Sequence, residues 1–174
     1  CNRMVFIRDG NVWISKVTGK MEKRLTTSGL DRNPAISADG EWIAYASNCD
    51  ESTGFCHLYL GTSTGTTQKR FSMKGLHGAD FPAFAPDGST LAFVGLSGAK
   101  SHWPGEDVML VGTVSLMVID LLKLKSYVLV NRQDELIDGN MVLGFPSFSS
   151  DGRYIAFIDS SETAGEIEVV EANG

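Results

Sequence analysis

The stretch Pro34-Ala-Ile-Ser-Ala-Asp-Gly-Glu-Trp-Ile-Ala-Tyr45 occurs twice more in similar form. The second copy is Pro82-Ala-Phe-Ala-Pro-Asp-Gly-Ser-Thr-Leu-Ala-Phe93, and the third is Pro146-Ser-Phe-Ser-Ser-Asp-Gly-Arg-Tyr-Ile-Ala-Phe157. The proline, a large apolar residue, the Asp-Gly pair and a closing apolar-Ala-aromatic triplet keep the same offsets in all three copies. Each copy predicts a short extended segment, a tight turn at Asp-Gly and a second strand, because glycine adopts positive φ readily and proline is tolerated at a strand start. A unit written three times predicts a repeat architecture.

The second strand of each copy is apolar on both faces, so the sheet that contains it must be covered on both sides. A third strand is predicted at 57–60, 116–119 and 167–170, and a more polar fourth strand at 68–71 and 126–130. The amino-terminal segment reads as strands two to four of the same unit, at 4–7, 12–15 and 22–26. No helical periodicity is visible. The sequence therefore predicts an all-β chain of fourteen strands.

Four-stranded antiparallel units with a recurrent motif favour a β-propeller, in which each blade is packed between its neighbours. A solenoid or a two-sheet sandwich is the alternative. The approximate units are 1–32, 33–80, 81–144 and 145–174, so about three and a half blades are present. The incomplete units at both ends indicate part of a larger propeller. Open ends expose strand edges and blade faces, which predicts self-association or marginal stability.

The pattern Pro-x-[Ile/Phe]-[Ser/Ala]-x-Asp-Gly-x-x-[Ile/Leu]-Ala-[Tyr/Phe] resembles the WD40-like, or PD40, propeller repeat. That repeat is known from the propeller domain of TolB and from propellers of prolyl-oligopeptidase-like peptidases. The chain departs from the common form at Ile36, where an aromatic is usual, and at Ala38 and Ser150, where proline is usual. The resemblance implies a non-catalytic, TolB-like scaffold that binds a protein or peptide in the periplasm or outside the cell. A substrate-gating propeller of a prolyl-oligopeptidase-like (S9) serine peptidase and a carbohydrate- or ligand-binding propeller are the alternatives.

Composition excludes several other classes of function. The net charge is −6 and the basic residues are scattered, whereas nucleic-acid binding needs a basic footprint. No apolar run reaches the roughly 18 residues of a membrane-spanning helix, so no membrane span is predicted. The chain begins at Cys1, which leaves lipidation of this cysteine open.

Loop lengths suggest which face of the propeller binds a partner. The connections 48–56, 73–80, 97–113 and 132–144 are long and fall on one face, whereas the Asp-Gly turns on the other face are short. Long connections are where repeat scaffolds usually place recognition. Drift in loop length without a function is the alternative. Candidate partner-binding residues on the long-loop face are His77, Asp80, His102, Trp103, Glu106 and Asp107.

No catalytic, cofactor or metal site is predicted. The stretch Gly61-Thr-Ser-Thr-Gly65 matches the Gly-x-Ser-x-Gly string of serine hydrolases, but no helical pattern follows it and no histidine and carboxylate are evident partners, so it reads as a turn. The three histidines lack metal-ligand spacing with each other or with a cysteine. The aspartates of the Asp-Gly pairs are turn formers, because the alternating carboxylates of a calcium loop are absent.

Cys49 and Cys56 lie at opposite ends of the connection between strands two and three of a blade. Antiparallel pairing would bring their side chains together, so they are a candidate disulfide. The bond would close an eight-residue ring worth about 2.5 kcal/mol in the chain-entropy model, and it would imply an oxidising compartment. Two reduced thiols that lie near each other are the alternative.

Overall fold

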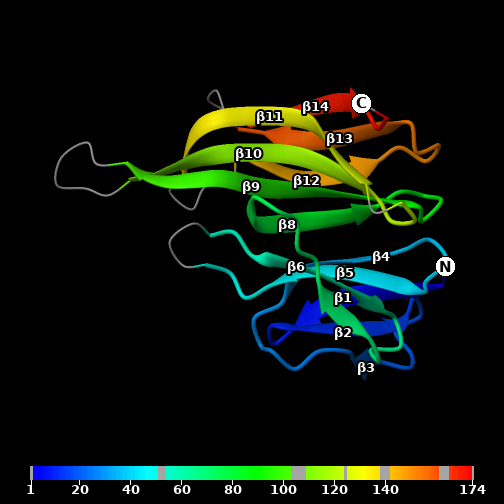
Figure 1. The fold of residues 1–174 in the computed structure, drawn as a ribbon. Coiled ribbons are helices and arrows are strands. Elements are labelled where there is room, and N and C mark those ends of the chain that lie inside the picture. The colour runs from blue at the N-terminus through cyan, green and yellow to red at the C-terminus, as the bar shows by residue number, and fades with distance from the viewer. Residues whose placement is uncertain are drawn as a thin grey trace.

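The computed structural model describes residues 2–50, 54–102, 109–123, 125–137, 142–160 and 165–173. In this part of the chain there are fourteen strands and no helix, arranged in four antiparallel sheets of three or four strands (Figure 1). The predicted all-β propeller architecture is therefore confirmed. Since none of these residues is helical, the described chain also contains no helix that could cross a membrane.

Each sheet is a meander in which the strands pair in chain order. Sheet A contains β1 (Arg3–Arg8), β2 (Asn11–Lys16) and β3 (Lys23–Arg24). Sheet B contains β4 (Arg32–Ile36), β5 (Trp42–Ser47), β6 (His57–Thr62) and β7 (Gln68–Arg70). Sheet C contains β8 (Leu76–Phe84), β9 (Thr90–His102), β10 (Met109–Asp120) and β11 (Lys125–Ile137). Sheet D contains β12 (Leu143–Phe148), β13 (Tyr154–Asp159) and β14 (Glu166–Glu171).

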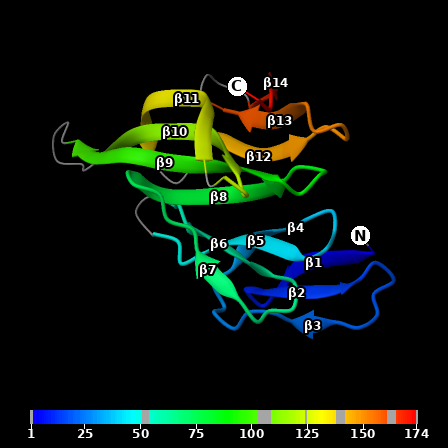
Figure 2. The same ribbon diagram turned by 45° about the vertical axis from the view of Figure 1, so that its right-hand side comes forward.

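The sheets follow one another in space in the order A, B, C, D, as both views show (Figure 1, Figure 2). The first strands of consecutive sheets, β4, β8 and β12, lie next to each other, and we call them the inner strands. The apolar core is correspondingly divided into three clusters, each formed mainly between two neighbouring sheets. Val12 and Ile14 of sheet A pack with Ile43 and Tyr45 of sheet B; the other clusters join sheet B to C and sheet C to D. Packing of each sheet on its neighbours is the arrangement expected of propeller blades.

The Asp-Gly pair of each repeat forms the predicted tight turn. Gly40, Gly88 and Gly152 have φ values of 78°, 72° and 73°. Each glycine amide donates to the carbonyl oxygen three residues earlier, at 2.9 Å in all three copies. Positive φ is easily adopted only by glycine, so the glycine of the repeat is required by the backbone.

A β-bulge precedes the proline of each repeat. Asn33, Phe81 and Phe145 stand directly before the three prolines and have φ values of 49°, 53° and 53°. The register of each inner strand with its neighbour shifts at the same place. The residue before a proline ordinarily adopts an extended conformation, so the sequence did not predict this left-handed position.

Sheet C is longer than predicted. The segment 73–80 is predicted to be a connection, but β8 already begins at Leu76. The segments 97–113 and 132–144 are predicted to be loops, but β9 continues to His102, β10 begins at Met109 and β11 continues to Ile137. Lys100 pairs with Val111, which pairs in turn with Leu136. Serine, glycine and lysine made these segments look like loops, but pairing with the apolar first half of β10 holds them in the sheet. We call the residues 97–102, 109–113 and 132–137 the arm; β9 and β10 extend beyond the neighbouring sheets in Figure 1.

Candidate functional site

The predicted partner-binding residues are not gathered into one site by the described part of the structure. His77 and Asp80 belong to β8, where His77 is exposed and Asp80 is completely buried. His102 is the last residue of β9. Trp103, Glu106 and Asp107 lie outside the described residues, so their role stays a prediction.

Asp80 joins two inner strands. Its Oδ2 accepts a hydrogen bond from Arg32 Nε at 2.8 Å and lies 2.6 Å from Arg32 Nη2. Its Oδ1 accepts hydrogen bonds from Asn33 Nδ2 at 2.8 Å and from its neighbour's amide, Phe81 N, at 2.7 Å. A buried carboxylate is tolerated only when it is paired and hydrogen-bonded in this way. The carboxylate therefore ties β4 to β8.

The bulge residues beside this cluster form an aromatic pair. The rings of Phe81 and Phe145 lie 4.5 Å apart between centroids with planes inclined by 49°, a tilted contact within the favourable range for aromatic side chains. Phe145 is nevertheless 62% exposed. It is the third residue of β12 and lies near the start of that strand, after the connection from β11. We call Phe81 and Phe145 the inner aromatic pair.

Cys49 and Cys56 are joined by a disulfide in the structure. Two backbone hydrogen bonds join described residues of the ring that they close, from Asp50 N to Phe55 O and from Gly54 N to Asp50 O, both at 2.8 Å. Cys56 is completely buried and its Sγ lies 3.4 Å from Asp80 Oδ2. The disulfide of sheet B therefore touches the buried carboxylate of sheet C.

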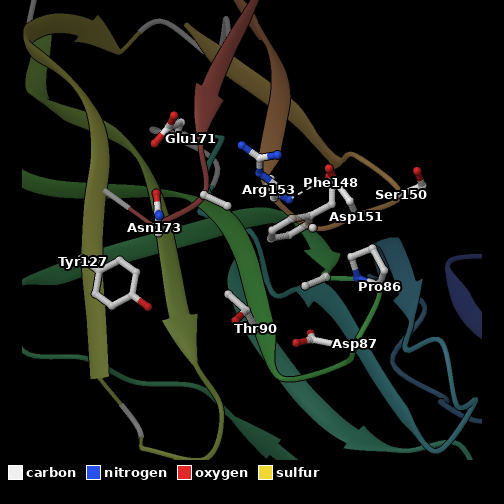
Figure 3. A pocket seen from close by; sticks show the side chains of 13 residues that line it. Pro86, Asp87, Thr90, Tyr127, Phe148, Ser150, Asp151, Arg153, Glu171 and Asn173 are labelled. Carbon is white, nitrogen blue, oxygen red and sulfur yellow. Dashed lines mark hydrogen bonds between the residues drawn. The ribbon is translucent and has the colours of Figure 1, made fainter.

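A cavity of about 660 Å³ lies between sheets C and D on the side of the Asp-Gly turns. Figure 3 shows Tyr127 of β11, Phe148 of β12 and the turn aspartates Asp87 and Asp151 among the residues that line it. The Ser149 hydroxyl and, to a smaller extent, a backbone amide hold the pKa of Asp151 below its usual value. Asp151 is thus ionised at neutral pH. The lining combines aromatic side chains with carboxylates and the Arg153 guanidinium, which suits a polar small molecule. Sequence reasoning missed this cavity, because no loop length or motif marks the junction of two blades.

A more apolar groove of about 540 Å³ lies between the outer strands of sheets B and C. Trp42, Phe71 and Met73 line it, and Lys69 and Arg70 of β7 are the charged residues of its lining. Trp42 is exposed, so the groove opens to solvent. Nothing in its chemistry points to a reaction.

The Gly-x-Ser-x-Gly string forms part of the turn between β6 and β7. The Gly65 amide donates to Thr62 O at 2.9 Å. Ser63 is buried, and its hydroxyl accepts a hydrogen bond from Arg3 Nη1 at 3.1 Å. This environment differs from the exposed serine hydroxyl that a nucleophile elbow needs. Among the described residues, no group of three or more His, Cys, Asp or Glu side chains could hold a metal ion.

Solved structures with the same arrangement of sheets are numerous. The crystal structure of TolB from Acinetobacter baumannii superposes with a TM-score of 0.66 and 21% identity, over 99% of this chain and 40% of that one. A putative TolB from Agrobacterium tumefaciens gives a TM-score of 0.60 and 20% identity, over 99% of this chain and 56% of that one. The fold is that of a TolB-like β-propeller.

The TolB-like propeller fold is shared with peptidases. Porphyromonas gingivalis dipeptidyl peptidase 4 superposes with a TM-score of 0.57 and 15% identity, over 99% of this chain and 30% of that one. The chain thus spans about half or less of the length of each of these proteins. No protein-family model matches the sequence, and no curated protein sequence matches it either.

Proposed function

We propose that this chain is a non-catalytic propeller scaffold that binds a protein or peptide segment on the face opposite the Asp-Gly turns. The observation that carries the proposal is Phe145, a large aromatic side chain that is 62% exposed. Its backbone has φ 53°, a conformation that is costly for a bulky residue. The same geometry at Asn33 and Phe81 belongs to the bulge of every repeat, and at Phe145 this constant backbone holds a large aromatic side chain in solvent. Aromatic residues also dominate the binding energy of many interfaces.

The surroundings of Phe145 support an apolar partner side chain at this position. Phe81 packs against one side of the ring and fixes its orientation. Asp80, the nearest ionisable group along β8, is paired with Arg32 and buried. A partner that covers Phe145 therefore buries apolar surface without having to desolvate that charge.

A role in the cell envelope is part of the same proposal. The fold is that of TolB-like propellers, and the disulfide between Cys49 and Cys56 is stable in an oxidising compartment such as the periplasm or the cell exterior. The buried, hydrogen-bonded state of Ser63 supports a scaffold rather than an enzyme. If the parent protein carries a peptidase domain, the propeller would gate its substrate instead.

The experiment selects peptides against the intact chain from a random displayed library and measures their dissociation constants by fluorescence anisotropy. Phe145→Ala should weaken binding by about 30-fold, the effect of losing a central aromatic anchor. Leu122→Ala is the matched control, because Leu122 is an apolar side chain, 86% exposed, in the turn between β10 and β11. Equal affinities for wild type and Phe145→Ala, or an equal loss in both variants, would contradict the proposal.

The cavity between sheets C and D favours a second candidate, the binding of a saccharide or other small polar ligand. Tyr127 and Phe148 offer ring faces and the turn aspartates offer hydrogen-bond acceptors. A thermal-shift screen against saccharides tests this candidate, because a ligand at 100 times its Kd stabilises the folded state by about 2.7 kcal/mol. Stabilisation that Tyr127→Ala does not abolish would place the ligand elsewhere.

A further inference from the structure

The disulfide ring of sheet B is fastened to the inner strand of sheet C. The carbonyl oxygen of Cys56 accepts a hydrogen bond from the Ala79 amide of β8 at 2.7 Å. Phe55 is buried in the cluster between sheets C and D. The carbonyl oxygen of Gly54 accepts a hydrogen bond from Arg32 Nη2 at 2.5 Å, and the same guanidinium pairs with Asp80. The segment 54–56 of sheet B is thus held by the β8 backbone, by the apolar cluster between sheets C and D and, through Arg32 of its own sheet, by Asp80.

The two sulfur atoms of this disulfide have different surroundings. Cys56 is completely buried, with its Sγ 3.4 Å from Asp80 Oδ2. Cys49 is only partly buried. Of the two cysteines, Cys49 is therefore the one that a thiolate in solution can approach more easily. When a thiolate attacks Cys49, the Cys56 sulfur must leave as a thiolate. This sulfur lies beside the Asp80 carboxylate, and the negative charge of the carboxylate disfavours a second negative charge on the sulfur.

We propose that the Cys49–Cys56 disulfide is a redox-responsive latch between sheets B and C, opened by a dithiol at Cys49 and held shut by the Asp80 carboxylate behind Cys56. This inference stands independently of the proposed partner binding. It concerns how the two blades are fastened, whatever the propeller binds.

The exchange balances with a dithiol as the reductant. One thiolate of the dithiol attacks Cys49 Sγ; the Cys49–Cys56 bond breaks, and Cys56 leaves as a thiolate that takes up a proton. The second thiol of the reductant, once deprotonated, displaces Cys49 from the mixed disulfide, and Cys49 also takes up a proton. Two electrons and two protons pass to the protein, which gains two thiols, and the reductant becomes a cyclic disulfide.

Opening should be local, because the ladder beneath the ring does not depend on the bond. Ser47 pairs with His57 across β5 and β6, directly below the two cysteines. Without the disulfide, the ring residues regain chain entropy while this ladder persists. The contacts that the ring makes with sheet C, above all the hydrogen bond from Ala79 to Cys56, are the ones expected to weaken. Such local opening is the usual basis of a switch.

The first experiment treats the native chain with dithiothreitol and follows alkylation by mass spectrometry, thermal unfolding and hydrogen exchange. Reduction should add two alkylated cysteines, lower Tm by about 7 °C for a chain of this size, and raise exchange at residues 54–56 and at Ala79. Exchange in sheet A should not change. Cys49→Ser should reproduce these changes, and Cys1→Ser, which leaves the ring intact, should not. A reduced protein with unchanged exchange at Ala79, or with exchange raised equally in all four sheets, would overturn the latch.

The second experiment tests the role of the carboxylate through the rate of reduction by dithiothreitol. Asp80→Asn should accelerate reduction about fivefold, because the departing Cys56 thiolate no longer faces a negative charge. Asn33→Gly is the matched control: it removes one donor from Asp80 and keeps the left-handed backbone, so it loosens the cluster and retains the charge. It should not accelerate reduction. Equal acceleration in both variants would mean that loosening alone controls access, and the proposed role of Asp80 would be refuted.

Discussion

The hydroxyl group at the fourth position of the repeated phrase offers a quantitative test of how the phrase works. Ser37 Oγ donates to Asp39 Oδ1 at 2.5 Å and accepts from Trp42 N at 3.0 Å. Ser149 Oγ makes the same two bonds in the third copy, donating to its aspartate at 2.6 Å and accepting from a backbone amide at 3.0 Å. The second copy has Ala85 at this position. The protein thus contains two turns with the hydroxyl and one without.

Burial decides how much each hydroxyl contributes. A typical hydrogen bond contributes about 1 kcal/mol net, and a buried group left without a partner costs more. Ser37 is buried, so Ser37→Ala should cost about 2 kcal/mol, because water does not easily replace its two bonds. Ser149 is more accessible, and Ser149→Ala should cost about half as much. For a chain of this length the two changes correspond to losses of about 6 °C and 3 °C in Tm.

The assay is thermal unfolding of the two serine variants and of Ala85→Ser, followed by circular dichroism. Ala85→Ser should raise Tm by up to about 3 °C, because its hydroxyl would stand beside Asp87 as the other serines stand beside their aspartates. Asp87 now accepts hydrogen bonds from Ser89 N and Ser89 Oγ, at 2.9 and 2.8 Å. If Ser37→Ala and Ser149→Ala lower Tm by the same amount, or if Ala85→Ser lowers Tm, the serine–aspartate pair is not the source of the stabilisation.

Two further predictions concern pH and close backbone packing. Hydrogen bonds from the turn serine hydroxyls and, to a smaller extent, from backbone amides lower the pKa of Asp39 and Asp151 below 3.8. A lowered folded-state pKa adds stability that is complete above the unfolded value and is lost as the pH falls through the folded value. Replacing both aspartates by asparagine should therefore make Tm fall less steeply between pH 5 and pH 2.5 than in the wild type. Parallel curves of Tm against pH for the two proteins would show that the turn aspartates do not cause the fall. Gly10→Ala places a Cβ 2.1 Å from the carbonyl oxygen of Gly29 and should cost more than about 3 kcal/mol, whereas Gly29→Ala meets no atom within 4 Å and should cost about 1 kcal/mol for its positive φ. Urea midpoints that are equal for the two variants would show that the close approach is not needed.

The architecture could be predicted because the repeated phrase encodes it through local rules. Proline, Asp-Gly and a two-sided apolar strand specify a strand, a turn and a buried strand without reference to distant residues. Four such units leave few ways to bury both faces of every sheet, and the propeller is one of them. The strand positions could be predicted for the same reason, because the apolar pattern of a strand and the residues of a turn are both properties of neighbouring residues.

The arm and the cavity could not be predicted in this way. Ser97 and Lys100 have no strand signal of their own; they belong to β9 because the opposite strand supplies partners from Thr113 back to Met109. The cavity is lined by Tyr127 of one blade and Phe148 of the next. Both features depend on which segments become neighbours, and a single sequence read by local pattern does not contain that information.

The bulges before the prolines show how a constant backbone can carry different chemistry. One backbone geometry, repeated in β4, β8 and β12, displays an asparagine in the first copy and phenylalanines in the next two. Asn33 turns to the buried carboxylate of the adjacent strand, Phe81 becomes the support of an aromatic pair, and Phe145 is left exposed. The proline that follows each of them fixes the strand, so the residue before it can vary without altering the sheet. At this position before the proline, a substitution can therefore change what the propeller binds while the fold is preserved. Of Asn33, Phe81 and Phe145, which occupy this position in the three repeats, Phe145 is the most exposed.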